Sequence, residues 1–164
     1  MRPMRFVTGG RHSQRLPGHN YASSAIYFVT ICTYERICWF GDIVDGRLVP
    51  TRAGEIVEAA WRTTLQRFGQ VSLDSFVVMP NHVHGLIRIG PGAGTEPLGA
   101  MIRAFKGAST HMIRASGDAS FGWHRNYHDH VVRDAASLER IRQYILTNPR
   151  SWENDIYHPT REGL

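Results

Sequence analysis

The chain has 164 residues and carries 19 Lys and Arg against 14 Asp and Glu, which gives a formal charge of +5 at pH 7. Hydrophobic residues make up 42% of it, which excludes a disordered chain and is enough for the core of one domain. No apolar run reaches the roughly 18 residues of a membrane span and no secretory leader is evident, so we expect a cytoplasmic protein with no membrane contact and an anionic partner.

Residues 1–23 are expected to form a basic, flexible N-terminal arm, because they are rich in Gly, Pro and Ser and contain no acidic residue. The first acid of the chain is Glu35, and the arginines that precede it are Arg2, Arg5, Arg11 and Arg15. Such an arm can grip an anionic partner, and it can equally be a solvated tail that binds nothing.

The first elements of the domain are a strand, a small hairpin and a helix. Residues 25–33 (AIYFVTICT) are β-branched and aromatic, as in a buried strand, and residues 40–49 contain the Asp-Gly signal of a hairpin turn. Residues 51–69 predict a helix that stops at Gly69. Its apolar residues recur at helical spacing: Val57, Trp61, Leu65 and Phe68.

A strand pair and a second helix follow. Residues 71–79 and 82–89 predict two strands separated by a Pro-Asn break, and residues 90–97 predict a loop. Residues 98–115 predict an amphipathic helix with basic residues opposite its apolar side. The apolar side is expected to comprise Leu98, Met101, Phe105 and Met112.

The last elements are a strand near the end of residues 121–133 and a helix over 135–149, which Pro149 stops. The element order favours an α+β fold, with a ferredoxin-like antiparallel sheet, helices packed on one face and a further C-terminal helix. We expect a single domain over residues 24–158, followed by a short tail at 159–164.

Two histidines interrupt the apolar strand at 82–89. Side chains two positions apart on a strand point to the same face, so His82 and His84 project together while Val83 enters the opposite layer. Two such imidazoles can share a divalent ion, and they can also simply hydrogen-bond on the sheet face.

A second histidine group lies in the stretch WHRNYHDH. His128 and His130 would share a strand face, with His124 upstream. Three interpretations remain open: a second ligand set, a nucleic-acid contact surface with Trp123 and Tyr127, or a local hydrogen-bond network.

The final helix carries Tyr144 and Asn148 one turn apart, at the margin of an apolar stripe formed by Leu138, Ile141 and Ile145. A tyrosine at such a margin usually fills core, and an asparagine in a last turn usually caps the helix. Beside a metal-bound phosphodiester, however, the phenol could act as a nucleophile and the amide oxygen as a neutral ligand.

At these residues the sequence resembles a known family. The stretch MPNHVHGLI followed by YILTNP is similar to the single-tyrosine HUH transposases, in which a bulky residue separates two histidines. The REP-associated tyrosine transposases are the branch that it resembles over residues 24–158. The stretches that carry this resemblance are FVTICTYERICWF, LGAMIRAFKGAST, YHDHVVRD and YILTNPRSWENDIYH.

The resemblance implies a role for each matched residue. His82 and His84 would bind Mg²⁺ or Mn²⁺, and Tyr144 would attack a phosphate of single-stranded DNA, leaving a 5′-phosphotyrosine and a free 3′-hydroxyl. Insertion-sequence members place a glutamine four residues after the tyrosine as a further metal ligand. Here that position is Asn148, one methylene shorter.

The expected partner is single-stranded or hairpin DNA of the REP-like type. Basic and aromatic side chains would contact its phosphates and unpaired bases, and the alternative for the basic ones is an ordinary solvated face. The residues concerned are Lys106, Arg103, Arg114, Trp123, Tyr127, Arg5, Arg11 and Arg15.

The sequence therefore predicts a metal-dependent DNA strand transferase that works as a monomer or a homodimer. Two other functions stay open: a domesticated hairpin-DNA-binding protein without turnover, and a metal phosphodiesterase that uses water while Tyr144 only fills core.

Overall fold

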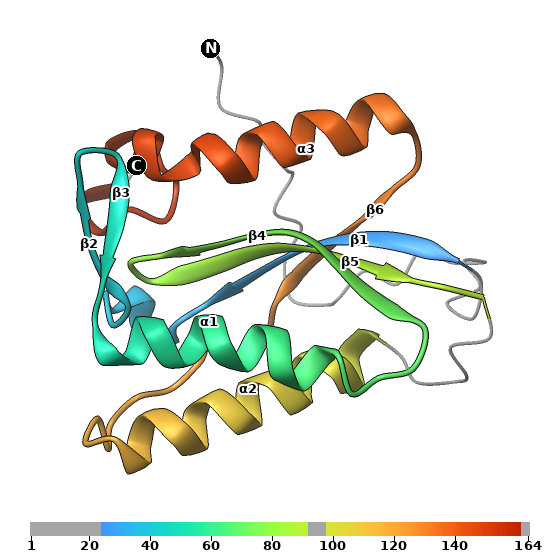
Figure 1. The fold of residues 1–164 in the computed structure, drawn as a ribbon. Helices are drawn as coiled ribbons and strands as arrows, with labels where there is room; N and C mark the ends of the chain where they lie inside the picture. The colour runs from blue at the N-terminus through green and yellow to red at the C-terminus, as the bar shows by residue number, and fades with distance from the viewer. Residues whose placement is uncertain (1–23, 92–97, 162–164) are drawn as a thin grey trace.

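A computed structural model describes residues 24–91 and 98–161 of the chain (Figure 1). Its centre is a four-stranded antiparallel sheet with the strand order β4-β5-β1-β6. The strands are β1 (Ala25–Cys32), β4 (Val71–Met79), β5 (His82–Ile89) and β6 (His128–Val132). The helices are α1 (Arg52–Leu65), α2 (Leu98–Ala115) and α3 (Ala135–Thr147), with short 3₁₀ turns at Tyr34–Arg36, Asn148–Asn154 and Pro159–Arg161.

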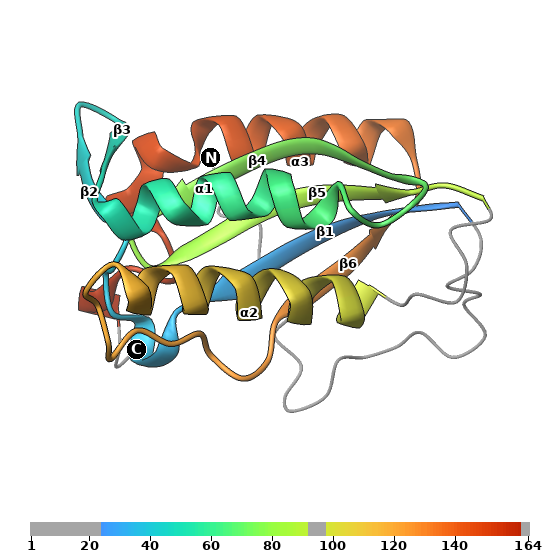
Figure 2. The same ribbon diagram turned by 60° about the horizontal axis from the view of Figure 1, so that its bottom comes forward.

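The sheet is the middle of three layers. Helices α1 and α2 cover one face, and α3 lies across the other (Figures 1 and 2). Two clusters of buried side chains follow from this arrangement: a large one between the sheet and α1 and α2, and a small one under α3. The α+β class with an antiparallel sheet is thus confirmed, and the C-terminal helix takes the face that α1 and α2 leave uncovered.

Strand β5 divides its side chains between these two layers. Val83 and Ile87 enter the large core, whereas Leu86 joins the cluster under α3, so the histidines at 82 and 84 also face α3. Gly85 is required by packing, because a Cβ at that position would collide with the indole ring of Trp61 on α1. The small residue in the HVHG stretch therefore lets α1 seat directly against the strand.

A separate two-stranded sheet joins β2 (Gly41–Val44) to β3 (Arg47–Pro50). The two residues between them, Asp45 and Gly46, have φ values of 50° and 71°. Positive φ at both central positions is what a type I′ hairpin turn requires, so the Asp-Gly signal predicts this turn correctly.

Two helix details differ from expectation. Helix α1 ends at Leu65 rather than at Gly69, because the next residues form 3₁₀-type bonds, including Phe68 N to Leu65 O, before Gln70 turns the chain with φ 59°. On α2, Met112 is 44% exposed, since the buried stripe runs from Phe105 through Ser109 to Ile113 in steps of four residues.

Residues 148–161 are not a simple tail beyond α3. They form 3₁₀ turns that bury Trp152, Asp155 and Tyr157 against the end of the sheet. The sequence of this segment shows no repeating apolar pattern, because isolated buried side chains rather than one face of a helix hold it against the sheet. The arginines of the N-terminal arm (Arg5, Arg11 and Arg15) lie outside the described residues.

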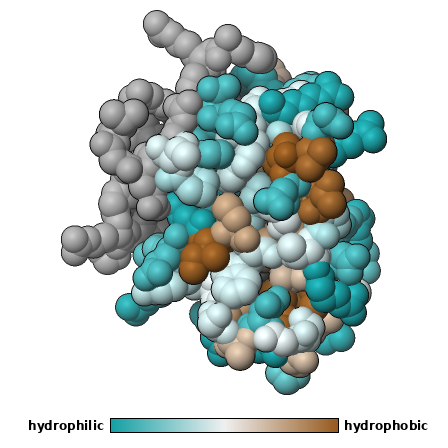
Figure 3. Space-filling model, turned by 90° about the vertical axis from the view of Figure 1, so that its left-hand side faces the viewer, coloured by the Kyte–Doolittle hydropathy of each residue, from teal (hydrophilic) through white to brown (hydrophobic). Residues whose placement is uncertain are grey.

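The surface at the β2–β3 end of the molecule is mostly hydrophilic. Figure 3 shows its hydrophobic side chains as small, separate patches. The large hydrophobic residues that are exposed in the described chain come from several elements and are Tyr34, Ile37, Val44, Val49, Met112, Leu146 and Ile156. Among the described residues, no helix is both long and apolar enough to cross a bilayer.

Candidate active site and nucleic-acid interface

His82 and His84 meet at the end of β5, on the face that α3 covers. Their Nε2 atoms are 3.1 Å apart, and the residues are 0% and 2% exposed. The ring of Phe28 stacks on His84 at 5.3 Å, and the ring of Tyr157 lies 4.6 Å from His82. The two imidazoles are therefore held together among buried aromatic side chains, on one face of the strand as their spacing predicts.

A network behind the histidines fixes which nitrogen of His82 carries the proton. The Nδ2 of Asn81 donates to the carbonyl oxygens of Arg36 and Tyr157, at 2.9 and 2.8 Å. The amide oxygen of Asn81 is thus left as the acceptor for His82 Nδ1, at 2.8 Å. With the proton on Nδ1, the lone pair of Nε2 points into the site, which is the form that binds a metal.

His84 is oriented in the same way by β1. Its Nδ1 lies 2.8 Å from the hydroxyl of Thr30, which is its partner across the β1–β5 ladder. Burial lowers the pKa of His84 to about 3 and also lowers the pKa of His82 well below its ordinary value. Both rings are therefore neutral at pH 7 and available as ligands.

Tyr144 projects from α3 toward this pair. Its hydroxyl lies 3.4 Å from His84 Nε2, and its ring packs edge-on against Phe28. Burial, and then the charge of Asp155, raises the pKa of the phenol, while a hydrogen bond with the Asn148 side chain lowers it in part. A phenolate would form here only with help from a nearby positive charge.

Asp155 is a site residue that the sequence does not single out. Its side chain is buried, one carboxylate oxygen lies 3.9 Å from His82 Nε2, and the other accepts from the backbone N–H of Tyr157 at 2.8 Å. One ligand atom from each of His82, His84 and Asp155 falls within a cluster 4.8 Å across. Asp155 lies in a polar stretch with no apolar periodicity, so the local pattern does not predict it. The family resemblance of YILTNPRSWENDIYH, which includes Asp155, is the sequence feature that could have pointed to it.

Asn148, the expected third ligand, is 2% exposed at the end of α3. Its Oδ1 is buried without a hydrogen-bond partner among the described residues. An unpaired buried oxygen is costly, and a cation or a bound polar group would satisfy it. Asp155 thus provides an oxygen donor beside the two histidines, and Asn148 holds a second buried oxygen one helical turn after Tyr144.

The residues fit a divalent ion. Cis ligands of an octahedral ion with bonds of about 2.1 Å lie about 3 Å apart, which matches the 3.1 Å between the two Nε2 atoms. Two neutral nitrogens and a carboxylate are donors that Mg²⁺ or Mn²⁺ accepts, and the outward nitrogen of each ring is already anchored.

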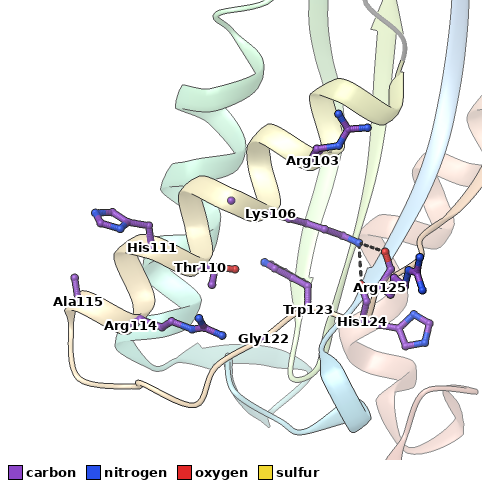
Figure 4. Close-up of a pocket in the computed structure, with 11 residues that line it drawn as sticks. Arg103, Lys106, Thr110, His111, Arg114, Ala115, Gly122, Trp123, His124 and Arg125 are labelled. Atoms are coloured by element: carbon purple, nitrogen blue, oxygen red, sulfur yellow. Dashed lines mark hydrogen bonds between the residues drawn. The ribbon is translucent and has the colours of Figure 1, made fainter.

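A basic groove lies on the opposite face of the sheet, along α2 (Figure 4). Its volume is about 780 Å³. Its lining comes from α2 and from the segment that leads to β6, and comprises Arg103, Lys106, Gly107, Thr110, His111, Arg114, Ala115, Gly122, Trp123, His124 and Arg125. Three of the predicted basic DNA contacts thus share one surface.

Lys106 has a different environment from the exposed arginines. Its Nζ donates to the carbonyl oxygens of His124, Arg125 and Asn126, at 2.9, 3.3 and 3.2 Å, and it lies over the ring of Tyr127. Burial lowers its pKa to about 8. The ammonium holds the 124–126 backbone in place, a role that the motif AFKGAST does not reveal.

Trp123 is also engaged within the protein. Its indole N–H donates to Ser109 Oγ at 3.0 Å, and its ring packs on Phe105 and Phe121 at 5.5 Å each. Arg114 donates through Nε to the carbonyl of Phe121 at 2.9 Å. Arg103 and Arg125 remain as the exposed guanidinium groups of the groove, and Arg125 is absent from the sequence-based prediction.

Comparisons with known proteins agree with this architecture. A protein of Haemophilus influenzae, itself without an assigned function, is 35% identical, covering 88% of this chain and 91% of its own length. A REP-associated tyrosine transposase bound to a REP hairpin has a similar fold, with a TM-score of 0.61 and 19% identity over 81% of this chain and 71% of that one. A protein of Deinococcus radiodurans described as a candidate transposase has a TM-score of 0.53 and 20% identity over 79% and 94% of the two chains.

The family model described as "Transposase IS200 like" matches residues 22–148, which include the sheet, both histidines and Tyr144. That match spans most of the chain. The chain therefore belongs to the IS200-like transposase family.

Proposed function

We propose that this protein is a metal-dependent DNA strand transferase that cuts and rejoins single-stranded DNA through a covalent bond to Tyr144. The observation that supports it best is the 3.4 Å approach of the Tyr144 hydroxyl to His84 Nε2, inside a cluster of metal-ligating groups. A tyrosine that merely filled core would not need two neutral histidines and a buried carboxylate beside its hydroxyl.

His82, His84 and Asp155 would hold the ion, while the Asn148 amide N–H would orient the phenol and its unpaired oxygen could serve as a further ligand. Mg²⁺ or Mn²⁺ in this place would withdraw charge from the phosphoryl oxygens and favour the phenolate. Tyr144 would need this cation, because burial raises the pKa of its phenol and the phenol would otherwise stay protonated.

The chemical step is a transesterification. The Tyr144 oxygen gives up its proton and forms a bond to phosphorus, while the bond between phosphorus and the 3′ oxygen breaks and that oxygen takes up a proton. The number of ester bonds is unchanged, so no ATP is required. Attack by another 3′-hydroxyl on the phosphotyrosine reverses the reaction and joins strands.

The DNA partner would be a hairpin with single-stranded flanks, of the REP-like type. The α2 groove supports this proposal, because Arg103 and Arg125 are exposed there and Arg114 lies beside them. We assign Lys106 and Trp123 to shaping the groove rather than to direct contact, on the basis of their internal hydrogen bonds.

The decisive experiment is a covalent adduct assay. Purified protein is mixed with end-labelled hairpin DNA from the flank of its own gene, with Mn²⁺ or with EDTA, and separated on a denaturing gel. We expect a shifted protein–DNA band that requires Mn²⁺ and is absent in Tyr144→Phe.

Two other outcomes would reject the proposal. Cleavage without a shifted band, unchanged in Tyr144→Phe, would identify a phosphodiesterase that uses water. Tight hairpin binding with no cleavage and no adduct across a Mn²⁺ titration would identify a binding protein without turnover.

A further inference from the structure

Helices α2 and α3 lie on opposite faces of the same sheet (Figures 1 and 2). The basic groove lies along α2 and Tyr144 projects from α3, so the two candidate sites are on opposite faces. A DNA molecule that uses both must pass from one face of the sheet to the other, and the edge strands of the sheet are β4 and β6. Helices α1 and α3 both pack on β4, whereas the groove ends on the segment that leads directly into β6. The β6 edge therefore offers the direct route.

The exposed histidines of β6 face the tyrosine site. His128 is paired with Thr30, and Thr30 is paired with His84, so the three residues form one row across the sheet. His130 is in the next row, beside Phe28, which packs against Tyr144. Because adjacent strands are about 4.8 Å apart, His128 lies roughly 10 Å from His84 along this row.

The segment before β6 forms a bulge relative to β1. Trp123 pairs with Thr33 and His128 with Thr30, so five steps along this segment oppose three steps along β1. Lys106 holds the extra residues by binding three consecutive carbonyls. The exposed His124 and Arg125 on this bulge also line the groove.

We propose that this bulge and the β6 histidines guide single-stranded DNA around the sheet edge, from the α2 groove to Tyr144. His124 and Arg125 would meet the strand where it leaves the groove, and His128 and His130 would bind its phosphates and base edges next to the site. The inference rests on the proposed function for the identity of the ligand.

The chemistry of these side chains suits unpaired nucleotides. An imidazole donates hydrogen bonds to phosphate or base atoms and offers a flat face on which a base can stack. Partial burial and the nearby His124 lower the pKa of His128, so its ring is neutral near pH 7.

The test compares two DNA probes in a Tyr144→Phe background, which prevents cleavage. One probe is the hairpin alone, and the other is the same hairpin with a single-stranded extension, placed in turn on the 5′ and the 3′ side. We expect the extension to tighten binding several-fold and the double variant His128→Ala/His130→Ala to abolish that gain. Affinity for the hairpin alone should stay within twofold.

Two control variants sharpen the result. Arg67→Ala removes an exposed charge beyond the end of α1 and should change neither affinity. Arg103→Ala should weaken both probes and reduce the salt slope by about 1. Equal weakening of both probes by the histidine variant, or no weakening of either, would overturn the inference.

This design separates the inference from the proposed function. If wild-type protein forms no adduct but the histidine variant still loses the gain from the extension, the DNA path stands and the transferase proposal fails. If the adduct forms and the histidine variant binds the extended probe like its parent, the path is wrong and the transferase proposal stands.

Discussion

At the scale of single residues, the geometry of the site depends on which hydrogen-bond donor and acceptor each polar side chain pairs with. Asn81 donates to two carbonyls and so presents its oxygen to His82, which leaves the Nε2 lone pair of His82 directed at His84. Desolvation then keeps both imidazoles neutral. Two neutral nitrogens and a buried carboxylate thus lie close enough to share one divalent cation. Asn148 adds a buried amide oxygen that has no hydrogen-bond partner in the described structure.

The role of Asp155 can be tested by changing only its charge. Asp155→Asn preserves the side-chain shape, so it should lower Mn²⁺ affinity by about tenfold or more while the fold is kept. The measurement is the Mn²⁺ concentration that gives half-maximal adduct formation. Glu153→Gln is the matched control, because that carboxylate is 86% exposed on the adjacent 3₁₀ turn. An unchanged Mn²⁺ requirement in Asp155→Asn would remove Asp155 from the ligand set.

At the scale of elements, α3 must be held in register for Tyr144 to reach the histidines. The anchor is Asp74 on β4, next to an irregularity in the β4–β5 ladder. Arg142 binds both of its carboxylate oxygens, at 2.9 and 2.6 Å, and Arg88 approaches the same group. This ion pair ties the half of α3 that carries Tyr144 to β4.

Loss of this anchor should reduce both stability and adduct formation. Asp74→Asn is expected to lower the unfolding free energy only modestly, because the Arg142 side chain is 37% exposed and water screens the ion pair. It should also slow adduct formation while DNA affinity is maintained. Chemical denaturation measures the first effect, and Arg140→Ala, an exposed change on the same helix, should leave it unchanged.

The pH dependence of this anchor has a defined sign. The hydrogen bond from Arg142 lowers the pKa of Asp74 from 3.8 to about 2. The stabilisation of the folded state by the Asp74 carboxylate is therefore complete above about pH 5. It is lost as pH falls from about 4 to 2, because Asp74 of the unfolded chain binds its proton at a higher pH than Asp74 of the folded protein. The stability difference between wild type and Asp74→Asn should shrink across that window. A constant difference down to pH 2 would assign the ion pair no structural role.

At the scale of the whole molecule, charge and chemistry are divided between the two faces of the sheet. The basic groove lies along α2 (Figure 4), the Tyr144 site lies under α3, and β6 is the edge strand that follows the groove segment in the chain. Under the proposed function, this division would let a basic surface hold DNA while the reaction takes place among the buried aromatic side chains of the other face.

The groove can be tested without disturbing the fold. A Cβ at Gly107 would meet nothing within 4 Å, so both Gly107→Ala and Gly107→Glu should be accommodated and should strengthen α2. The alanine variant should bind hairpin DNA like wild type, whereas the glutamate should weaken binding about tenfold through repulsion of phosphates. Fluorescence anisotropy over a salt series measures this. Equal affinities of the two variants would place the DNA elsewhere.

Much of the fold could be predicted from the sequence, because the strands, helices and turns depend on the local pattern of apolar, polar and turn-forming residues. The strands at 71–79 and 82–89 and the helix at 98–115 have the predicted bounds, and the Asp-Gly turn forms as its backbone preference requires. The alternation of faces also puts His82 and His84 together and sends Val83 into the core. Each of these features depends on neighbours within a few positions of the chain.

The tertiary structure alone decided which distant residues meet. Asp155 reaches the histidines because the non-periodic segment after α3 folds back over the end of the sheet. Lys106 donates hydrogen bonds to the backbone of residues 124–126, and Arg142 forms an ion pair with Asp74. Only folding brings these distant parts of the chain together. Local periodicity cannot encode such pairings, because their stability comes from desolvation and geometry at the point where separate elements pack.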